Sequence, residues 1–484
     1  METYNGKPWI KRDLEDELLD SLAYGQPHIG YWVRGLKGAG KTSLLMKFGQ
    51  TRHKRFYSID LTDQRLKNEL EQELHSVYMR NIYDDYHKGN ADAVFKKFIP
   101  GFVDDPDSFL LLDEIQESMR IYNLAKQILR GLDAKVAFCG SFLGDSKESN
   151  YELCPLGEVS CFDLLPVTYR EFVGSITALK SYASSDLFAP SQDHGSAEAL
   201  TATKPYWEVY NEIGGFPAPL LESMSLGLQS ASFSRDAALD SYIQTIAKKT
   251  HYGFSSDWSK LIGFIVSNAL SEVQVELGSA PALDMTSKIS LKLITKLLEW
   301  LEGSGALSIV SSVSDLRERQ FFTSSKFMFT NYELLRRLAF ASGTDKTLAL
   351  HKSAKLEAYA LNELRALKSM YEPTSLTSFR ETNIDAIEEV VFAFKTPKGA
   401  RVLLEAKGAD ANSAGSLALA NRDADFLISL CAGAGSIRGN KLTLSLCNSD
   451  KLKKAIELIN FAYATGISLE EAYSRMAQGA KAEV

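Results

Sequence analysis

The stretch GLKGAGKT, residues 35–42, decides the fold of the N-terminal part of this chain. An apolar run, GYWVRG, precedes it, and SLLMKF follows it with the pattern of a helix start. Its spacing fits GxxxxGK[ST], a loop whose backbone amides point at a phosphate on a helix N-terminus. We therefore predict a phosphate-binding loop rather than a plain glycine-rich turn. Its predicted nucleotide-binding residues are Gly35, Gly38, Gly40, Lys41, Thr42 and Ser43.

Two residues of this loop carry specific chemistry. Lys41 adds a full positive charge beside the phosphates, and the hydroxyl of Thr42 would hold Mg²⁺. Such a site needs a second motif, and SFLLLDEIQE ends an apolar run with Asp113 and Glu114. We predict that Asp113 holds Mg²⁺ through water and that Glu114 polarises the attacking water. A solvated strand end is the alternative for this pair.

A third candidate residue ends the next apolar run, KVAFCGS. Ser141 stands where ATPases with a strand inserted between the two motifs place a polar residue near the γ-phosphate. A helix-capping serine is the alternative.

Composition limits the classes of protein that this chain can represent. Its 484 residues predict more than one domain, and 45% hydrophobic with 24% charged residues is ordinary for a globular protein. A net charge of −7 excludes a chain that is a polycation throughout. The sequence shows no signal peptide and no apolar run of membrane-span length, so we expect a cytosolic protein without membrane contact. The five cysteines show no CxxC pair, which favours buried free thiols over disulfides or zinc.

The pattern of apolar runs predicts three domains. Up to about residue 165 short apolar runs alternate with helical patterns, which predicts an α/β domain with a parallel sheet over residues 1–225, with a surface insertion at 176–204. Residues 226–342 read as helices followed by a hairpin, which suggests a winged helix. Residues 345–484 alternate helices and strands and predict a third, α/β domain.

Eight motifs in order resemble a prokaryotic family of AAA-type P-loop ATPases with a winged-helix middle and a C-terminal domain similar to PD-(D/E)XK nucleases. These motifs are GLKGAGKTSLL, FLLLDEIQE, FCGSFLG, LLPVTYREFV, GGFPAPL, LLEWLEGSGAL, KFMFTN and LEAYALNEL. The resemblance spans nearly the full length and implies ATP and Mg²⁺ as ligands. This chain departs from the family at Leu36, Lys37 and Gly38, where Pro-Arg-Gln is common. It also departs at Glu158, where relatives often carry an arginine, and a carboxylate cannot neutralise a γ-phosphate.

The predicted winged helix carries a basic stripe. Lys288, Lys292 and Lys296 recur every four residues on a face other than the apolar one, which suits contact with DNA phosphates. Arg317 and Arg319 at the presumed wing tip point the same way. A solvated lysine face, or a dimer or interdomain module, remains the alternative.

The C-terminal domain contains a candidate metal site. ARVLLEAKG places Glu405 and Lys407 two residues apart at a strand end, so that both side chains face the same way. Glu405 would bind Mg²⁺, and Lys407 would orient water or stabilise charge on the scissile phosphate. We expect Glu389 opposite Glu405 across a hairpin, with Asp385 as the alternative, and Glu357 matches the helix glutamate of the family.

Two functions fit these patterns. The first is an enzyme that binds and hydrolyses ATP to reposition domains acting on DNA, and that can form homo-oligomers. The second is an ATP-gated switch or interaction protein with little turnover and an inactive nuclease-like domain. Glu158 favours the switch, and the intact LLLDE and LEAKG motifs favour the enzyme.

Overall fold

The computed structural model describes residues 2–24, 30–80, 91–140, 159–176, 205–254, 258–269, 291–313, 324–343, 354–372, 376–380, 389–406, 424–431 and 434–482. The chain divides into two compact units. We call Arg12–Pro166 with Lys296–Ala306 the small unit, and Met1–Lys11 with Val167–Thr295 and Leu307–Val484 the large unit. These units do not follow the three domains predicted from the sequence, and they do not test that division. The three-domain division therefore stays a prediction.

A five-stranded parallel sheet forms the centre of the small unit. Its strands are β3 (Gly30–Arg34), β4 (Arg55–Asp60), β5 (Ser108–Asp113), β6 (Lys135–Gly140) and β7 (Val159–Asp163). They lie in the order β4-β5-β6-β3-β7, with parallel pairing throughout. The predicted parallel sheet, built from short apolar runs that alternate with helices, is therefore confirmed. Strand β6 lies between β3 and β5, as expected for an inserted strand.

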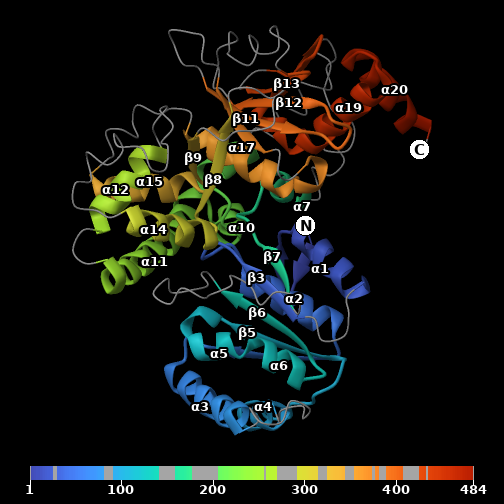
Figure 1. Ribbon diagram of the computed structural model, residues 1–484. Helices are drawn as coiled ribbons and strands as arrows, with labels where there is room; N and C mark the ends of the chain where they lie inside the picture. The colour runs from blue at the N-terminus through green and yellow to red at the C-terminus, as the bar shows by residue number, and fades with distance from the viewer. Residues whose placement is uncertain are drawn as a thin grey trace. The chain divides into compact units, whose positions relative to one another are not determined.

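Helices cover both faces of this sheet (Figure 1). On one face lie α1 (Asp13–Tyr24) and α2 (Lys41–Arg52), where the Phe48 ring of α2 lies 5.9 Å from the Tyr31 ring of β3. On the other face the Trp32 ring of β3 meets the Tyr122 ring at 5.2 Å. The helices on that face are α3 (Gln64–Arg80), α4 (Ala91–Phe98), α5 (Met119–Asn123) and α6 (Ala125–Gly131). Neighbouring residues of one strand thus face opposite layers, which explains why β3 is apolar without alternation.

The large unit contains a mixed eight-stranded sheet in the order β14-β15-β13-β12-β11-β10-β8-β9. Strands β8 and β9 pair antiparallel, so the predicted hairpin is confirmed. Strand β10 pairs with β8, and this pairing joins the hairpin to the C-terminal strands in one sheet. The strands are β8 (Leu307–Val313), β9 (Ser324–Phe329), β10 (Thr377–Arg380), β11 (Glu389–Lys395), β12 (Arg401–Ala406), β13 (Phe426–Cys431), β14 (Ser436–Arg438) and β15 (Lys441–Ser445).

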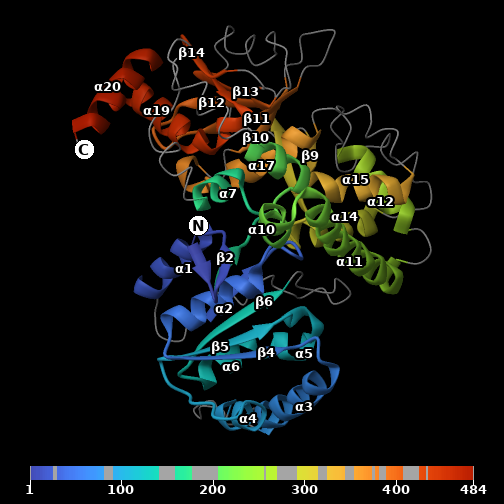
Figure 2. The same cartoon turned by 180° about the vertical axis from the view of Figure 1, so that it is seen from behind.

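Two helices pack on one face of the C-terminal strands (Figures 1 and 2). These are α17 (Ala354–Ala366) and α19 (Leu452–Thr465), whose apolar side chains join one core cluster with Val402, Leu404 and Ala406 of β12. Because side chains alternate along a strand, Leu403 and Glu405 face the opposite side of the sheet.

The remaining elements of the large unit are mostly helical. They are a hairpin of β1 (Glu2–Tyr4) and β2 (Lys7–Trp9), α7 (Tyr169–Ser175), a helix over 205–213, α10 (Pro217–Leu226), α11 (Leu228–Phe254), α12 (Trp258–Ala269), α15 (Tyr332–Ser342), the 3-10 helices η4 (Lys368–Met370) and η6 (Leu446–Lys451), and α20 (Leu469–Ala482). Helix α14 (Leu291–Gly303) contributes residues to both units. Across the described residues, no helix has both the length and the apolar character needed to cross a bilayer.

Candidate nucleotide-binding site

The loop between β3 and α2 depends on its glycines. Gly38 and Gly40 have φ values of 87° and 94°, which side-chain-bearing residues rarely adopt. A Cβ on Gly35 would lie 2.1 Å from the carbonyl oxygen of Leu164, so that position has no room for a side chain. Gly40 is the N-cap of α2 and leaves the first amides of this helix without a side-chain cap. The loop therefore offers free amides and a positive helix end to an anion.

Lys41 is the first residue of α2, and its side chain is 5% exposed. Its Nζ donates to the carbonyl oxygens of Gly35 at 2.9 Å and Leu36 at 3.1 Å. Burial lowers the pKa of Lys41, and the nearby Glu114 opposes that shift. An ammonium buried on loop carbonyls lacks a full counter-charge, which a bound phosphate would supply.

The second motif lies at the end of β5. Asp113 is 9% exposed, and its Oδ1 accepts hydrogen bonds from the Glu114 amide at 2.9 Å and from Cys139 Sγ at 2.6 Å. Glu114 has a φ of 52°, in the left-handed region, and its Oε2 accepts from the Gln116 side-chain amide. A non-glycine residue in this conformation is strained, and such strain is commonest at functional sites.

Residues of both motifs fit a magnesium ion. Thr42 is half-buried and follows Lys41 in the first turn of α2, while Asp113 presents a carboxylate at the end of a buried strand. Hydroxyl and carboxylate oxygens are the ligands that Mg²⁺ prefers. Ser43, the next residue, is exposed.

Cys139 is a contact that the sequence analysis did not assign. The thiol is fully buried on β6, and burial raises its pKa, so it stays a neutral donor to Asp113. Cys139, Cys431 and Cys447 are free, as expected. The expectation of free thiols is wrong for Cys161, which is disulfide-bonded. Cys161 lies exposed on β7, an edge strand, so its place in an apolar run did not imply burial.

Arg12 was also missed by the sequence analysis. Its side chain is 4% exposed, and its guanidinium donates to the carbonyl oxygens of Ala39 at 2.9 Å and Leu165 at 2.6 Å. Arg12 thus ties the phosphate loop to the segment after β7. Nothing in its local sequence signals this contact, because the partners lie 27 and 153 residues away.

The turn after α14 packs directly on the phosphate loop. Gly305 has a φ of 74°, and a Cβ there would lie 3.2 Å from the amide nitrogen of Leu36 and 3.3 Å from Cα of Gly35. Glu302 in the last turn of α14 attracts Arg34 of β3, which also pairs with Asp163 at 2.5 Å. The motif LLEWLEGSGAL therefore ends against the loop that the sequence predicts to hold phosphate.

Several residues that the sequence predicts to be functional are not described by the structure. Ser141 and Glu158 are outside the described residues, and so are Lys407, Asp385, Lys288, Arg317 and Arg319. Lys292 and Lys296 lie within α14, but their side chains are not described.

Of the predicted metal site in the C-terminal strands, the structure describes the side chains of Glu405 and Glu357. Glu405 is 2% exposed on β12, where Ser429 Oγ donates to its Oε1 at 3.0 Å and Lys441 Nζ lies 4.0 Å from the same oxygen. Neither Ser429 nor Lys441 was predicted. Within the described part of the chain, no three His, Cys, Asp or Glu side chains lie close enough to hold a metal.

The partners predicted for Glu405 are placed differently. The ladder pairs Phe392 with Leu404, which puts Val391 rather than Glu389 opposite Glu405. The expectation of a direct pair with Glu389 is therefore wrong by two residues, because the five-residue turn spans 396–400 and lies one residue later than the one inferred. Glu357 lies in the first turn of α17, which packs on the sheet face opposite the one that Glu405 faces.

One protein family matches part of this chain. Residues 29–173 match the family described as AAA domain. No curated protein matches the chain. Solved structures that resemble it include the Walker-type ATPase paby2304 of Pyrococcus abyssi, at 14% identity over 68% of this chain and 96% of that chain, with a TM-score of 0.39. Drosophila ORC bound to DNA matches at 14% identity over 69% and 96%, with a TM-score of 0.26. The Aeropyrum pernix ORC1 protein in complex with DNA matches at 12% identity over 69% and 91%, with a TM-score of 0.24.

The family match covers the strands and loops described above. It begins at β3 and ends within α7, and so includes the phosphate loop, Asp113 and Glu114. The scores of the solved structures are too low to support any closer relation. The chain thus carries an AAA-type P-loop ATPase domain over residues 29–173.

Proposed function

We propose that this protein binds ATP with Mg²⁺ in the small unit and hydrolyses it, and that the nucleotide state repositions a winged-helix part and a PD-(D/E)XK-like part that act on DNA. The observation that carries the proposal is the buried ammonium of Lys41. It lies at the N-terminus of α2, inside a loop with positive-φ glycines and within electrostatic reach of Asp113 and Glu114.

Each residue then has a role in ATP binding. Lys41 moves its ammonium from the loop carbonyls to the phosphates, while the loop amides and the helix end add partial positive charge. Thr42 and Asp113 hold Mg²⁺, which when bound neutralises phosphate charge. Glu114 orients and polarises the attacking water. Arg12 keeps the loop in place through Ala39.

The turn after α14 can transmit a change in the nucleotide state from the phosphate loop to the chain that follows it. Leu36 both accepts from Lys41 and touches Gly305, and β8 begins two residues after Gly305. When Lys41 turns toward a phosphate, the carbonyl of Leu36 loses a hydrogen bond beside this turn. The turn that precedes β8 is thereby in direct contact with the phosphate loop, within the small unit.

A nucleotide-gated switch with little turnover is the second candidate function. The carboxylate of Glu114 is held by Gln116, and in that position it is already engaged by a donor. Glu158 stands where relatives of the family resemblance often carry an arginine. Both features favour slow hydrolysis over fast hydrolysis.

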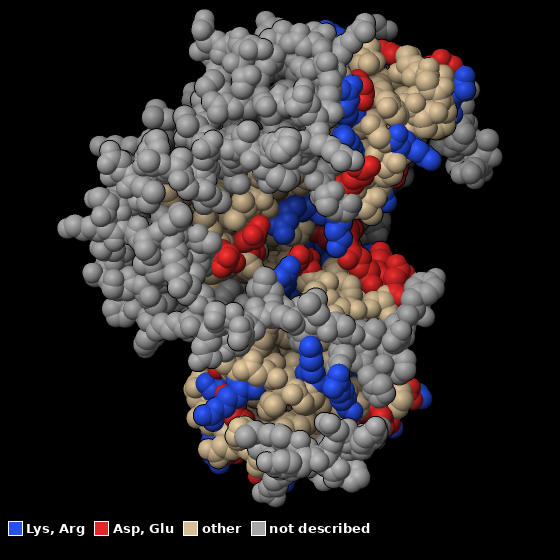
Figure 3. Space-filling view, viewed as in Figure 1, with Lys and Arg blue, Asp and Glu red and all other residues tan. Residues whose placement is uncertain are grey.

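The DNA part of the proposal depends on the lysine stripe of residues 288, 292 and 296. On the face seen in Figure 3, basic and acidic side chains of the described residues are interspersed. Several exposed ones are paired, such as Lys54 with Asp107 and Lys97 with Glu73. Paired surface charges bind DNA phosphates weakly, so a local stripe must supply the contact.

An ATP-turnover assay with and without duplex DNA tests the choice between these functions. The enzyme predicts saturable turnover that DNA changes, whereas the switch predicts ATP binding with turnover near background under both conditions. If the chain neither binds nor hydrolyses ATP, both candidates fail.

Salt dependence tests the DNA contact separately. Replacing Lys288, Lys292 and Lys296 with Gln should flatten the fall of log affinity with log salt by about 0.9 per lost contact. A matched control replaces the exposed Lys54, Lys398 and Lys453, which changes the net charge equally. Equal slopes in the two triple variants would remove the stripe from the DNA contact.

A further inference from the structure

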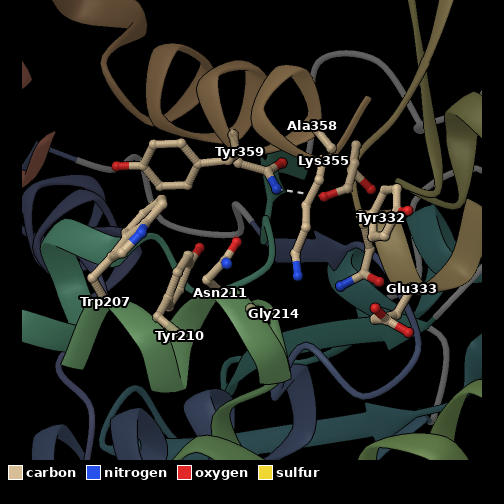
Figure 4. A pocket seen from close by; sticks show the side chains of 13 residues that line it. Trp207, Tyr210, Asn211, Gly214, Tyr332, Glu333, Lys355, Ala358 and Tyr359 are labelled. Carbon is tan, nitrogen blue, oxygen red and sulfur yellow. Dashed lines mark hydrogen bonds between the residues drawn. The ribbon is translucent and has the colours of Figure 1, made fainter. Parts of the chain in front are cut away.

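A small pocket of about 40 Å³ lies within the large unit, away from every residue assigned above (Figure 4). Its walls come from the helix over 205–213 and the turn after it, from the N-terminus of α15, and from one side of α17. A water needs roughly 10–15 Å³ by this measure, so the pocket holds a few waters or one small end group.

Lys355 of α17 supplies the positive charge of the pocket, and Figure 4 shows its side chain pointing into it. Its Nζ lies 5.6 Å from the centre of the Tyr332 ring. Among the described residues, Lys355 forms no ion pair or hydrogen bond. Burial lowers the pKa of Lys355. This ammonium is therefore partly desolvated, and the carboxylates of Glu333 and Glu212 attract it without forming an ion pair among the described residues.

The N-terminus of α15 supplies further donors. Asn331 caps the helix by accepting from the Leu334 amide at 3.0 Å. The amides of Tyr332 and Glu333, in the first turn, donate to nothing in the described part of the chain. Free amides at a helix N-terminus favour a bound anion, and here they line the same pocket as Lys355.

Asn362 gives independent evidence that a ligand binds in this pocket. Its side chain is 5% exposed and lines the pocket, and its Nδ2 donates to the carbonyl of Thr330. That contact fixes the orientation of the amide. Its Oδ1 is buried and accepts no hydrogen bond among the described residues. A buried acceptor without a donor is costly, so the occupant should carry an N–H group as well as an anionic oxygen.

The charge of the walls limits the anion to one negative charge. Glu333 also lines the pocket, and its carboxylate is held by Arg336 at 2.7 Å. Glu212, Arg235 and Arg336 also act on Lys355, so three cations face two carboxylates. This balance does not match a phosphate dianion, whereas it suits a single carboxylate.

We propose that this pocket binds the carboxylate of an amino-acid end group, meaning a carboxylate with an N–H donor one carbon away. A free amino acid and the C-terminus of a polypeptide share this chemistry. In both, the carboxylate lies between Lys355 and the α15 amides, and the N–H group donates to Asn362. The proposal is independent of ATP binding, so the test is run without nucleotide.

The test titrates the full chain with four probes, namely glycine, N-acetylglycine, acetate and glycinamide, and follows binding by calorimetry and by the fluorescence of Trp207. Glycine or N-acetylglycine should bind saturably. Acetate lacks the N–H group and glycinamide lacks the carboxylate, so each should bind about tenfold more weakly or not at all. Lys355→Gln should weaken binding about tenfold, while the exposed control Lys398→Gln should leave it unchanged.

Each outcome decides the proposal. Binding of glycine alone supports it with a free amino acid as the source, and binding of N-acetylglycine, alone or together with glycine, supports it with a polypeptide end. The proposal is overturned if neither glycine nor N-acetylglycine binds saturably. It is also overturned if acetate binds as tightly as these two probes. Asn362→Leu removes the buried acceptor and should also weaken binding of both probes. If this variant fails to fold, Lys355→Gln still decides, because the Lys355 side chain is only half-buried.

Discussion

The phosphate loop and the Glu405 region both place a buried charge at the end of a parallel strand, but they are built differently. The loop draws its glycines and Lys41 from eight consecutive residues. Glu405 finds its partners Ser429 and Lys441 on neighbouring strands, 24 and 36 residues later in the chain.

This difference has a chemical consequence. Lys41 is held by carbonyl oxygens, which leaves its charge available to a phosphate. Glu405 already has a hydroxyl donor and a lysine beside it. The first site is arranged to receive an anion, while the second already has a cation, Lys441, 4.0 Å from the Glu405 carboxylate. Each prediction below tests one side of this contrast.

The largest expected effect is on hydrolysis. Glu114→Gln should bind ATP with unchanged affinity and lose turnover by about 10²–10⁴-fold, because an amide cannot accept the proton of the attacking water. Steady-state phosphate release and equilibrium ATP binding measure the two quantities. Glu117→Gln, at an exposed position three residues away, is the control and should keep turnover. Unchanged turnover in Glu114→Gln would show that Glu114 does not polarise the attacking water.

A smaller effect is expected at Glu405. Glu405→Ala removes a buried acceptor from Ser429 and a charge from Lys441, and should lower the free energy of unfolding by about 2–4 kcal/mol. Glu405→Gln keeps an acceptor for Ser429 and should cost less. Urea unfolding of the three proteins measures this order.

Titration with Mn²⁺ separates the metal site from a structural ion pair. A nuclease-like site should bind Mn²⁺ saturably and lose it in Glu405→Ala, whereas Lys407→Ala should spare the metal, since a protonated lysine is no ligand. Absence of a saturable Mn²⁺ site in the parent protein would end the metal proposal and leave Glu405 as a structural residue.

A pH-dependent effect is expected at Glu363, a buried carboxyl of α17 whose Oε1 accepts from the Tyr169 amide at 2.6 Å. Burial raises its pKa from 4.5 to about 8, against the attraction of Arg170 and with the repulsion of Asp450. The protonated form is favoured on folding, so this stabilisation is complete below pH 4.5 and is lost as the pH rises through about 8. Glu363→Gln should therefore gain stability relative to the parent across that range.

Thermal unfolding between pH 5 and 9 measures this gain. The exposed Glu372→Gln is the control, and its difference from the parent should not follow the same curve. A constant difference between Glu363→Gln and the parent across this range would show that Glu363 does not titrate there.

The sequence predicted the features that depend on neighbouring residues. The five parallel strands, the phosphate loop and the hairpin β8–β9 follow from apolar runs and from one contiguous motif. Glycine spacing also signals backbone conformation directly, and Gly38 and Gly40 have the positive φ that their roles require.

Long-range contacts could not be predicted in the same way. Arg12 reaches Ala39, Cys139 reaches Asp113, and Gly305 reaches Leu36, and none of these pairs follows from local spacing. Register was also inaccessible, since a shift of two residues in the β11–β12 ladder separates Glu389 from Glu405 without changing the apolar pattern.

The central claim is that Lys41 holds the phosphates of ATP, and an equilibrium titration of the full chain with ATP and Mg²⁺ tests it most directly. The parent protein and the surface control Lys54→Ala should bind ATP alike, because Lys54 is 74% exposed and pairs with Asp107. Lys41→Ala should bind at least about tenfold more weakly, because it removes a charge-assisted contact to phosphate. Equal affinity of Lys41→Ala and the parent would contradict the assignment of this loop as the nucleotide site.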